Sequence, residues 1–182
     1  MEQRQDRAPS YLRVQQGVTI WLSHAVQGAI VRLARAYFPL EVGGLLLGWR
    51  DDRERIVTGL VGPGPGALHG RSAFVPDHAW QVAQLHQAFS ASGGDLDYLG
   101  DWHSHPAGVA QLSPVDRTTL ARIARRVPDP IMVIAAGSGH DWTLGSWSGK
   151  RAVLWRPAVI EERSLRPFSA PSEWSSFGLD QG

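Results

Sequence analysis

Two histidines and an aspartate, His103, His105 and Asp116, are the residues whose types and spacing most directly suggest chemistry. On a strand the two histidines would point to the same face, because alternate residues of a strand share a face. Asp116 follows far enough along the chain to begin a new element and fold back onto that face. Two imidazoles and a carboxylate match a catalytic zinc site, whose fourth position stays open for water. We therefore predict one Zn²⁺ ion here, with a bound water.

Asp116 also has a structural interpretation. Ser113 and Asp116 have the spacing of a capping box, with serine at the N-cap and an acid at the third helical position. The helix dipole favours a carboxylate in the first turn of any helix. The two interpretations are compatible, because a cap can fix the helix start that aims the carboxylate at a metal. If Asp116 binds the metal, we expect the capping box to be incomplete.

Glu41 stands immediately before an apolar segment, residues 42–47. Burial of a single carboxyl among such side chains would raise its pKa. A carboxyl of this kind can accept a proton from water and return it to a leaving amine, which typically contributes about 10²–10⁴-fold to the rate. The alternative is an exposed acid at the start of a strand, and the local sequence does not decide between the two.

Taken together, His103-Ser104-His105-Pro106, Ser113-x-x-Asp116 and the upstream Glu41 resemble the JAMM (MPN-plus) metalloprotease signature. The resemblance covers roughly residues 17–157. It implies that Glu41 and Ser113 are catalytic, with the Ser113 hydroxyl steadying an oxyanion beside the metal; a simple N-cap is the alternative role of Ser113. It also implies an α/β fold in which a curved mixed β-sheet is flanked by helices, as in JAB/MPN domains and cytidine deaminases.

JAMM enzymes typically cut after the C-terminal glycine of ubiquitin or a ubiquitin-like protein. Residues 98–106 look most similar to the stand-alone prokaryotic members, some of which accompany E1- and E2-like enzymes in antiphage operons of the CBASS and Bil types. The resemblance thus implies a ubiquitin-like protein and its conjugates as partners. Two alternatives stay open: processing of a sulfur-carrier protein of the ThiS or MoaD kind, and a metal-free MPN scaffold. The scaffold is disfavoured because all the polar signature residues are present.

Hydrophobic periodicity and turn signals predict the elements that position these residues. Helices are expected to begin after Ser23, Asp77 and Ser113. Strands are expected at residues 18–21, 41–49, 55–61, 72–75, 96–103, 131–136, 141–147 and 152–155, the last three as an antiparallel meander. This mixed order suits an α/β domain with helices packed on a mixed sheet.

The faces of two helices can also be predicted from spacing. For the helix after Asp77 we expect Val82, Leu85 and Phe89 to point inward, and for the helix after Ser113 the apolar face is Val115, Leu120 and Ile123. The chain divides into an N-terminal extension (1–16), the metalloprotease domain (17–163) and a tail rich in Ser, Pro and Gly (164–182). The tail is expected to be partly disordered or a docking strand.

Composition excludes several classes of protein. The 182 residues include no cysteine, so disulfides, Cys-based zinc fingers and Cys nucleophiles are excluded. A net charge of +1 does not suggest a nucleic-acid partner. Residues 1–10 lack the apolar core of a signal peptide, and the most apolar run, residues 42–49, is far too short to span a bilayer. We expect a cytoplasmic protein without a membrane partner.

Overall fold

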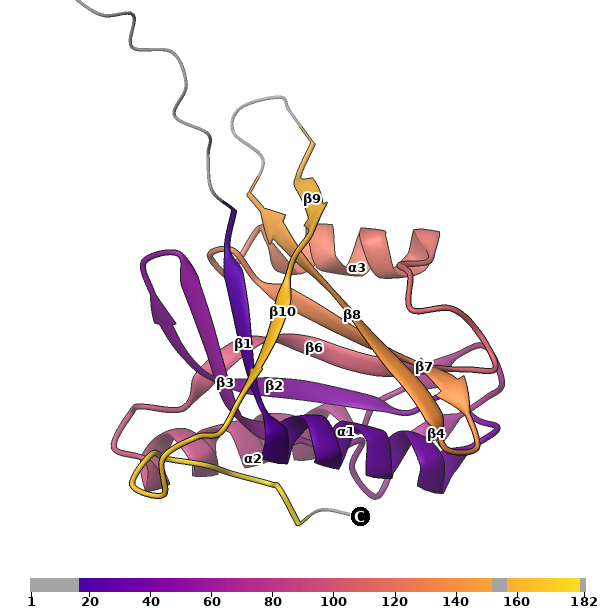
Figure 1. Ribbon diagram of the computed structural model, residues 1–182, viewed down its shortest axis with the longest axis horizontal. Helices are drawn as coiled ribbons and strands as arrows, with labels where there is room; N and C mark the ends of the chain where they lie inside the picture. The colour runs from indigo at the N-terminus through magenta and orange to yellow at the C-terminus, as the bar shows by residue number, and fades with distance from the viewer. Residues whose placement is uncertain (1–16, 152–156, 181–182) are drawn as a thin grey trace, which may run out of the picture.

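The computed structural model describes residues 17–151 and 157–180, which form an α/β domain built on a curved mixed sheet (Figure 1). The helices in these ranges are α1 (His24–Tyr37), α2 (His78–Ala91) and α3 (Pro114–Ile123). The strands of the main sheet are β1 (Thr19–Ser23), β2 (Gly43–Asp51), β3 (Glu54–Val61), β6 (Asp97–Pro106), β7 (Ile131–Ser138), β8 (Asp141–Lys150), β9 (Val159–Glu162) and β10 (Leu165–Phe168). A separate hairpin pairs β4 (Leu68–His69) with β5 (Phe74–Val75). The predicted fold class is confirmed.

The main sheet has the order β10-β1-β3-β2-β6-β7-β8-β9 in the described part of the chain. Strand β2 runs antiparallel to both β3 and β6, whereas β6 and β7 are parallel. The parallel pair is connected through α3, so that α3 begins near the carboxyl end of β6. This connection brings the first turn of α3 toward the two histidines that end β6.

Helix α1 covers one face of the sheet, and α2 and α3 cover the other. Strand β7 shows the division: Val133 packs in the cluster that contains α1, whereas Met132 and Ile134 pack against Leu120 of α3. Ala88 of α2 belongs to a further cluster on the α2 side. Because this strand is buried on both faces, its residues 131–136 are all apolar.

Two predicted helix faces are wrong at one residue each. Phe89 of α2 is 49% exposed and Val115 of α3 is 71% exposed. On α2 the buried residues include Gln81, whose side-chain amide donates to the carbonyl of Gly62 at 2.9 Å. On α3 the buried positions are Asp116 and Leu120, one turn apart. Each helix buries one polar residue, and the spacing of apolar residues does not reveal such a position. The face that packs on the sheet is therefore rotated about the helix axis relative to the predicted face.

The predicted meander is confirmed for β7 and β8, which pair antiparallel. The expected strand at residues 152–155 lies outside the described residues, and the next partner of β8 is β9. Beyond it, the tail behaves as a docking strand in its described part. Strand β10 pairs in parallel with β1, and farther on Leu60 of β3 donates its amide to the Phe177 carbonyl at 3.0 Å. The tail therefore covers the edge that β1 and β3 would otherwise expose.

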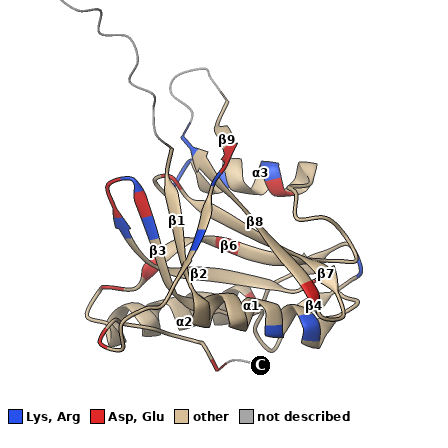
Figure 2. Cartoon of the chain, in the orientation of Figure 1, with Lys and Arg blue, Asp and Glu red and all other residues tan. Residues whose placement is uncertain are grey.

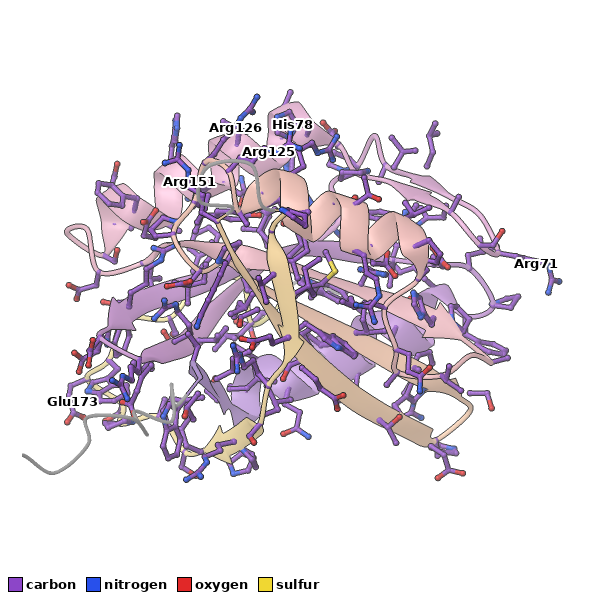
Figure 3. All side chains as sticks on the ribbon, turned by 90° about the horizontal axis from the view of Figure 1, so that it is seen from above. Arg71, His78, Arg125, Arg126, Arg151 and Glu173 are labelled. Atoms are coloured by element: carbon purple, nitrogen blue, oxygen red, sulfur yellow. The ribbon has the colours of Figure 1, made fainter. Side chains whose placement is uncertain are left out.

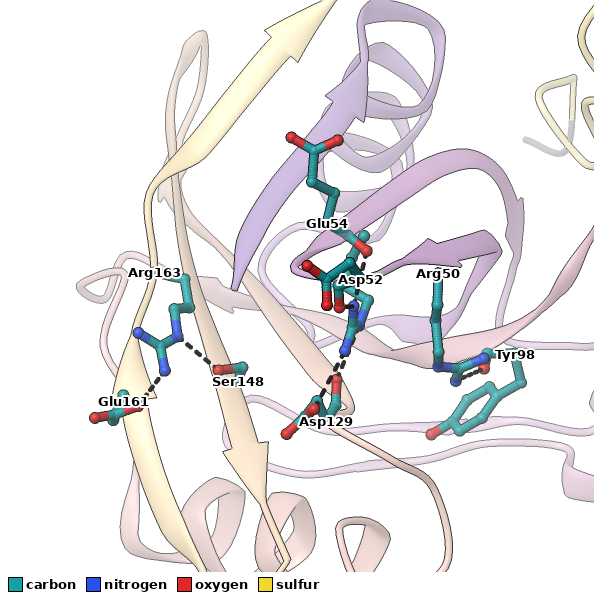
Figure 4. Close-up of polar contacts among 9 residues, drawn as sticks. Arg50, Asp52, Glu54, Tyr98, Asp129, Ser148, Glu161 and Arg163 are labelled. Carbon is teal, nitrogen blue, oxygen red and sulfur yellow. Dashed lines mark hydrogen bonds and ion pairs between the residues drawn. The ribbon is translucent and has the colours of Figure 1, made fainter. Parts of the chain in front are cut away.

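Charged side chains lie around the rim of the fold, and the strands crossing its centre carry few of them (Figure 2). Arg125, Arg126 and Arg151 lie toward the upper edge of the view in Figure 3. Arg55 is a buried charged residue, only 3% exposed; it pairs with Asp129 at 3.4 Å, among the contacts drawn in Figure 4. Burial lowers the pKa of Arg55, and the Asp129 carboxylate opposes that shift. No helix within residues 17–151 and 157–180 is long and apolar enough to cross a bilayer.

Candidate active site

The carboxyl end of β6 presents two imidazoles on one face, as alternation along a strand requires. The side chains of His103 and His105 are 14% and 17% exposed, and their Nε2 atoms lie 3.1 Å apart. Trp102, which precedes the pair, and Ser104, which separates the two histidines, point the other way and are buried. The strand therefore supplies two nitrogen donors aimed at a common point at the surface of the domain.

Asp116 of α3 brings a carboxylate to the same point. Its Oδ1 lies 3.1 Å from Nε2 of His103, and its Oδ2 lies 3.5 Å from Nε2 of His105. One ligand atom from each of the three residues lies within 4.8 Å of the others. Metal bonds of about 2.1 Å in tetrahedral geometry would place ligand atoms roughly 3.4 Å apart. The observed separations fit a metal ion held by His103, His105 and Asp116.

The tautomer of His105 suits a metal ligand. Its Nδ1 lies 3.2 Å from the carbonyl oxygen of Val109, and a carbonyl can only accept, so Nδ1 carries the hydrogen. In the neutral ring this leaves the lone pair on Nε2, which faces His103 and Asp116. A backbone carbonyl that orients a histidine in this way is a common outer contact of metal sites.

The capping box of α3 is complete, which corrects the expectation that metal ligation would leave it incomplete. The Ser113 amide donates to Asp116 Oδ2 at 2.7 Å, and the Asp116 amide donates to Ser113 Oγ at 3.2 Å. Oδ1 remains directed at His103, so the carboxylate divides its two oxygens between the cap and the site. Burial works against the charge, but hydrogen bonds from His103, His105 and Ser113 hold the pKa of Asp116 well below its usual range.

Glu41 lies two residues before β2, the strand that pairs with β6. Gly43 pairs with His103 in the antiparallel β2–β6 register. Continuing this register by two residues places the Glu41 main chain opposite His105. The chains approach closely here: a Cβ on Gly43 would lie 2.8 Å from the Cβ of His103. Burial raises the pKa of the Glu41 carboxyl; His103 and His105 oppose the shift and Asp116 adds to it. Each of these groups is thus within electrostatic reach of Glu41.

The structure brings His103, His105 and Asp116 together, places the Glu41 carboxyl within electrostatic reach of all three, and gives Ser113 only its capping contacts. It adds three contacts that sequence reasoning missed. His69 donates from Nδ1 to the Glu41 carbonyl at 2.8 Å, Ser104 Oγ accepts from the Val42 amide at 3.0 Å, and Val109 orients His105. No spacing rule connects His69 with Glu41, because the contact is made through tertiary packing.

Comparison with known proteins identifies the family of this domain. The family described as prokaryotic homologs of the JAB domain matches residues 23–148, a range that includes all five predicted site residues. The chain belongs to this prokaryotic JAB family. The resemblance noted in the sequence is therefore confirmed.

Relatives and one solved structure agree with this assignment. A probable metalloprotease, y4qB of Sinorhizobium fredii, is 33% identical over 150 residues, or 79% of this chain and 90% of its own. A protein of Vibrio cholerae named CD-NTase/cGAS isopeptidase is 30% identical over 58% of this chain and 66% of its own. The solution structure of DSY2949 from Desulfitobacterium hafniense has the same fold, with a TM-score of 0.62 and 24% identity over 83% of this chain and 95% of its own. The relatives support a JAB-type peptidase or isopeptidase with a metal ion at the His-His-Asp group.

Proposed function

We propose that the protein is a zinc-dependent isopeptidase or peptidase that cleaves after the C-terminal glycine of a ubiquitin-like protein. The observation that carries the proposal is the meeting of three metal donors with a single half-buried carboxyl, Glu41, at one end of β6. The donor set of two imidazoles and a carboxylate is typical of catalytic zinc. Bound zinc would supply a Lewis acid for the scissile carbonyl and would lower the pKa of a water molecule.

Glu41 is the proposed general base and general acid. Its raised pKa suits a group that takes a proton from the attacking water and gives it to the leaving amine. Ser113 is proposed to donate its hydroxyl hydrogen to the developing oxyanion. The Oγ of Ser113 accepts from the Asp116 amide, which leaves its own hydrogen available for that purpose.

The substrate class rests on both the relatives and the surroundings of the site. Relatives named CD-NTase/cGAS isopeptidases favour a protein conjugate as substrate, and we extend the proposal to a bacterial antiphage pathway with E1- and E2-like enzymes. The β4–β5 hairpin beside Glu41 is a separate two-stranded sheet with strand edges of its own. An extended substrate tail can bind such an edge through main-chain hydrogen bonds.

A cleavage assay tests the proposal. The substrate is a bacterial ubiquitin-like protein fused through its terminal glycine to a fluorescent reporter. We expect cleavage by the zinc-loaded protein, loss of cleavage with a chelator, and a fall of at least about 10²-fold in Glu41→Gln. Glu162→Gln, on the exposed face of β9, is the matched control and should cleave normally.

The opposite results would assign the site differently. Zinc-loaded protein that leaves the fusion intact but releases a sulfur-carrier protein from its precursor would replace the ubiquitin-like substrate with that class. Full activity in Glu41→Gln would remove Glu41 from the mechanism. If freshly purified protein contains no zinc, and His103→Ala does not change the zinc content, both the metal site and the enzymatic function are contradicted.

A further inference from the structure

The main chain at Glu41 is held from two sides. On the β6 side, Val42 and Ser104 exchange hydrogen bonds: the Val42 amide donates to Ser104 Oγ at 3.0 Å, and the Ser104 amide donates to the Val42 carbonyl at 2.8 Å. On the other side, the Glu41 amide donates to the Gly70 carbonyl at 2.7 Å, and His69 Nδ1 donates to the Glu41 carbonyl at 2.8 Å. Both peptide groups of Glu41 are therefore fixed by residues outside β2.

The His69 ring is itself fixed by aromatic packing. It stacks on Tyr37 from the end of α1, with ring centroids 4.2 Å apart and planes inclined by 30°. The Phe74 ring of β5 also lies beside the His69 ring, with ring centroids 5.4 Å apart and planes inclined by 35°. Because a carbonyl oxygen only accepts, the Nδ1 nitrogen facing Glu41 must carry the hydrogen. At the turn of the same hairpin, Arg71 projects away from the domain (Figure 3). The contacts with Glu41 come from His69, the last residue of β4, and from Gly70, the first residue of the turn.

We propose that His69 is a positioning residue for Glu41, clamping the Glu41 carbonyl so that its carboxylate is held against the metal ligands. This proposal rests on the proposed function, because it gives Glu41 the role of general base. His69 does not touch the metal donors in the described contacts; it acts through the Glu41 main chain. Displacement of a catalytic group by about 1 Å can lower a rate by as much as 10²-fold.

Three substitutions separate the hydrogen bond from the packing. His69→Phe keeps an aromatic ring against Tyr37 but has no donor, whereas His69→Asn can place an amide N–H close to the position of Nδ1. We expect His69→Phe to lower kcat on the ubiquitin-like fusion by about 10-fold, with KM and zinc content nearly unchanged. His69→Asn should recover most of the loss. His86→Phe, at an exposed histidine of α2, is the matched control and should match the wild type.

A double variant shows whether His69 acts through Glu41. In a Glu41→Gln background, His69→Phe should lower the residual rate no further, because effects of residues that act as a unit are not additive. A purely structural role would instead lower the melting temperature of every His69 variant and leave the loss in kcat additive with that of Glu41→Gln.

Amide hydrogen exchange reports the clamp without any substrate. In His69→Phe, exchange at residues 40–43 should rise by about 10-fold over the wild type, and His69→Asn should restore protection. Unchanged exchange, or raised exchange with unchanged kcat, would overturn the proposal. If the wild type does not cleave the fusion, the proposed substrate fails, and the exchange measurement alone decides whether the clamp exists.

Discussion

Substitution of Asp116 by Asn should remove metal binding while keeping the start of α3. The wild-type carboxylate gives Oδ2 to the Ser113 amide at 2.7 Å and Oδ1 to the site, 3.1 Å from Nε2 of His103. The Asn carbonyl oxygen can still accept from Ser113, but its amide nitrogen is no metal ligand. Asp116→Asn therefore separates the two roles of this side chain, which Asp116→Ala would remove together.

The expected sizes of the two effects differ. Loss of one half of the cap, as in Ser113→Ala, should cost about 1 kcal/mol. In a domain of this size that lowers the melting temperature by about 2–4 °C. Metal at roughly 100 times its dissociation constant stabilises the folded state by about 2.7 kcal/mol, which is therefore about 5–11 °C. In Ser113→Ala the melting temperature should still rise on addition of metal, although the metal-free protein melts lower than the wild type. In Asp116→Asn the melting temperature should not rise on addition of metal.

The assay is thermal unfolding of chelator-treated protein with and without added zinc, with the bound metal measured by elemental analysis. Without metal, both variants should melt below the wild type: Ser113→Ala loses half of the cap, and Asp116→Asn loses the carboxylate charge that His103, His105 and Ser113 stabilise. If Asp116→Asn binds one zinc and shows the same rise as the wild type, Asp116 is only a cap, and the three-ligand site is wrong. If Ser113→Ala loses zinc as well, the cap is needed to build the site, and the two roles are not separable.

Three further predictions use the same measurements. Burial raises the pKa of Glu41, so the folded metal-free protein holds this proton more tightly than the unfolded chain does, and its stability falls as pH rises from the ordinary glutamate range through the raised pKa. Metal-free Glu41→Gln should therefore melt higher than the wild type at pH 7 but not at pH 4; equal melting at both values would contradict the burial argument. Gly43→Ala places a Cβ 2.6 Å from the Trp102 carbonyl oxygen, so we expect a loss of about 1–3 kcal/mol and weaker zinc binding, measured by unfolding and metal titration. Phe177→Ala should lower stability by about 1–2 kcal/mol, because its ring is partly buried against the α2-side cluster; an unchanged melting temperature would mean that the tail contributes nothing there.

The placement of His103, His105 and Asp116 was predictable because most of it follows from local geometry. Alternation along β6 puts His103 and His105 on one face whatever the rest of the fold does. The Ser113 cap fixes where α3 begins, and the position of Asp116 in the first turn follows from it. Only the approach of α3 to β6 depends on tertiary structure.

The contacts around Glu41 were not predictable, because they are not local. His69 and Glu41 are separated by 28 residues, and a histidine on a short hairpin carries no periodic signal. The rotation of α2 was mispredicted for a related reason. Gln81 is buried, and its side-chain amide donates to a loop carbonyl. The pattern of apolar residues does not predict that an amide side chain is buried.

Because the metal-binding residues are placed mainly by local structure and Glu41 by distant contacts, we expect two classes of variants that lose the proposed activity. The metal donors are held by elements that form from their own sequences, so substitutions elsewhere in the domain should seldom remove the metal. Glu41 depends on a hairpin, on the end of α1 through Tyr37, and on Ser104 of β6. Many distant substitutions can shift one of these supports. Variants that keep zinc but lose turnover should therefore map to the surroundings of Glu41, and variants that lose both should map to β6 and the first turn of α3.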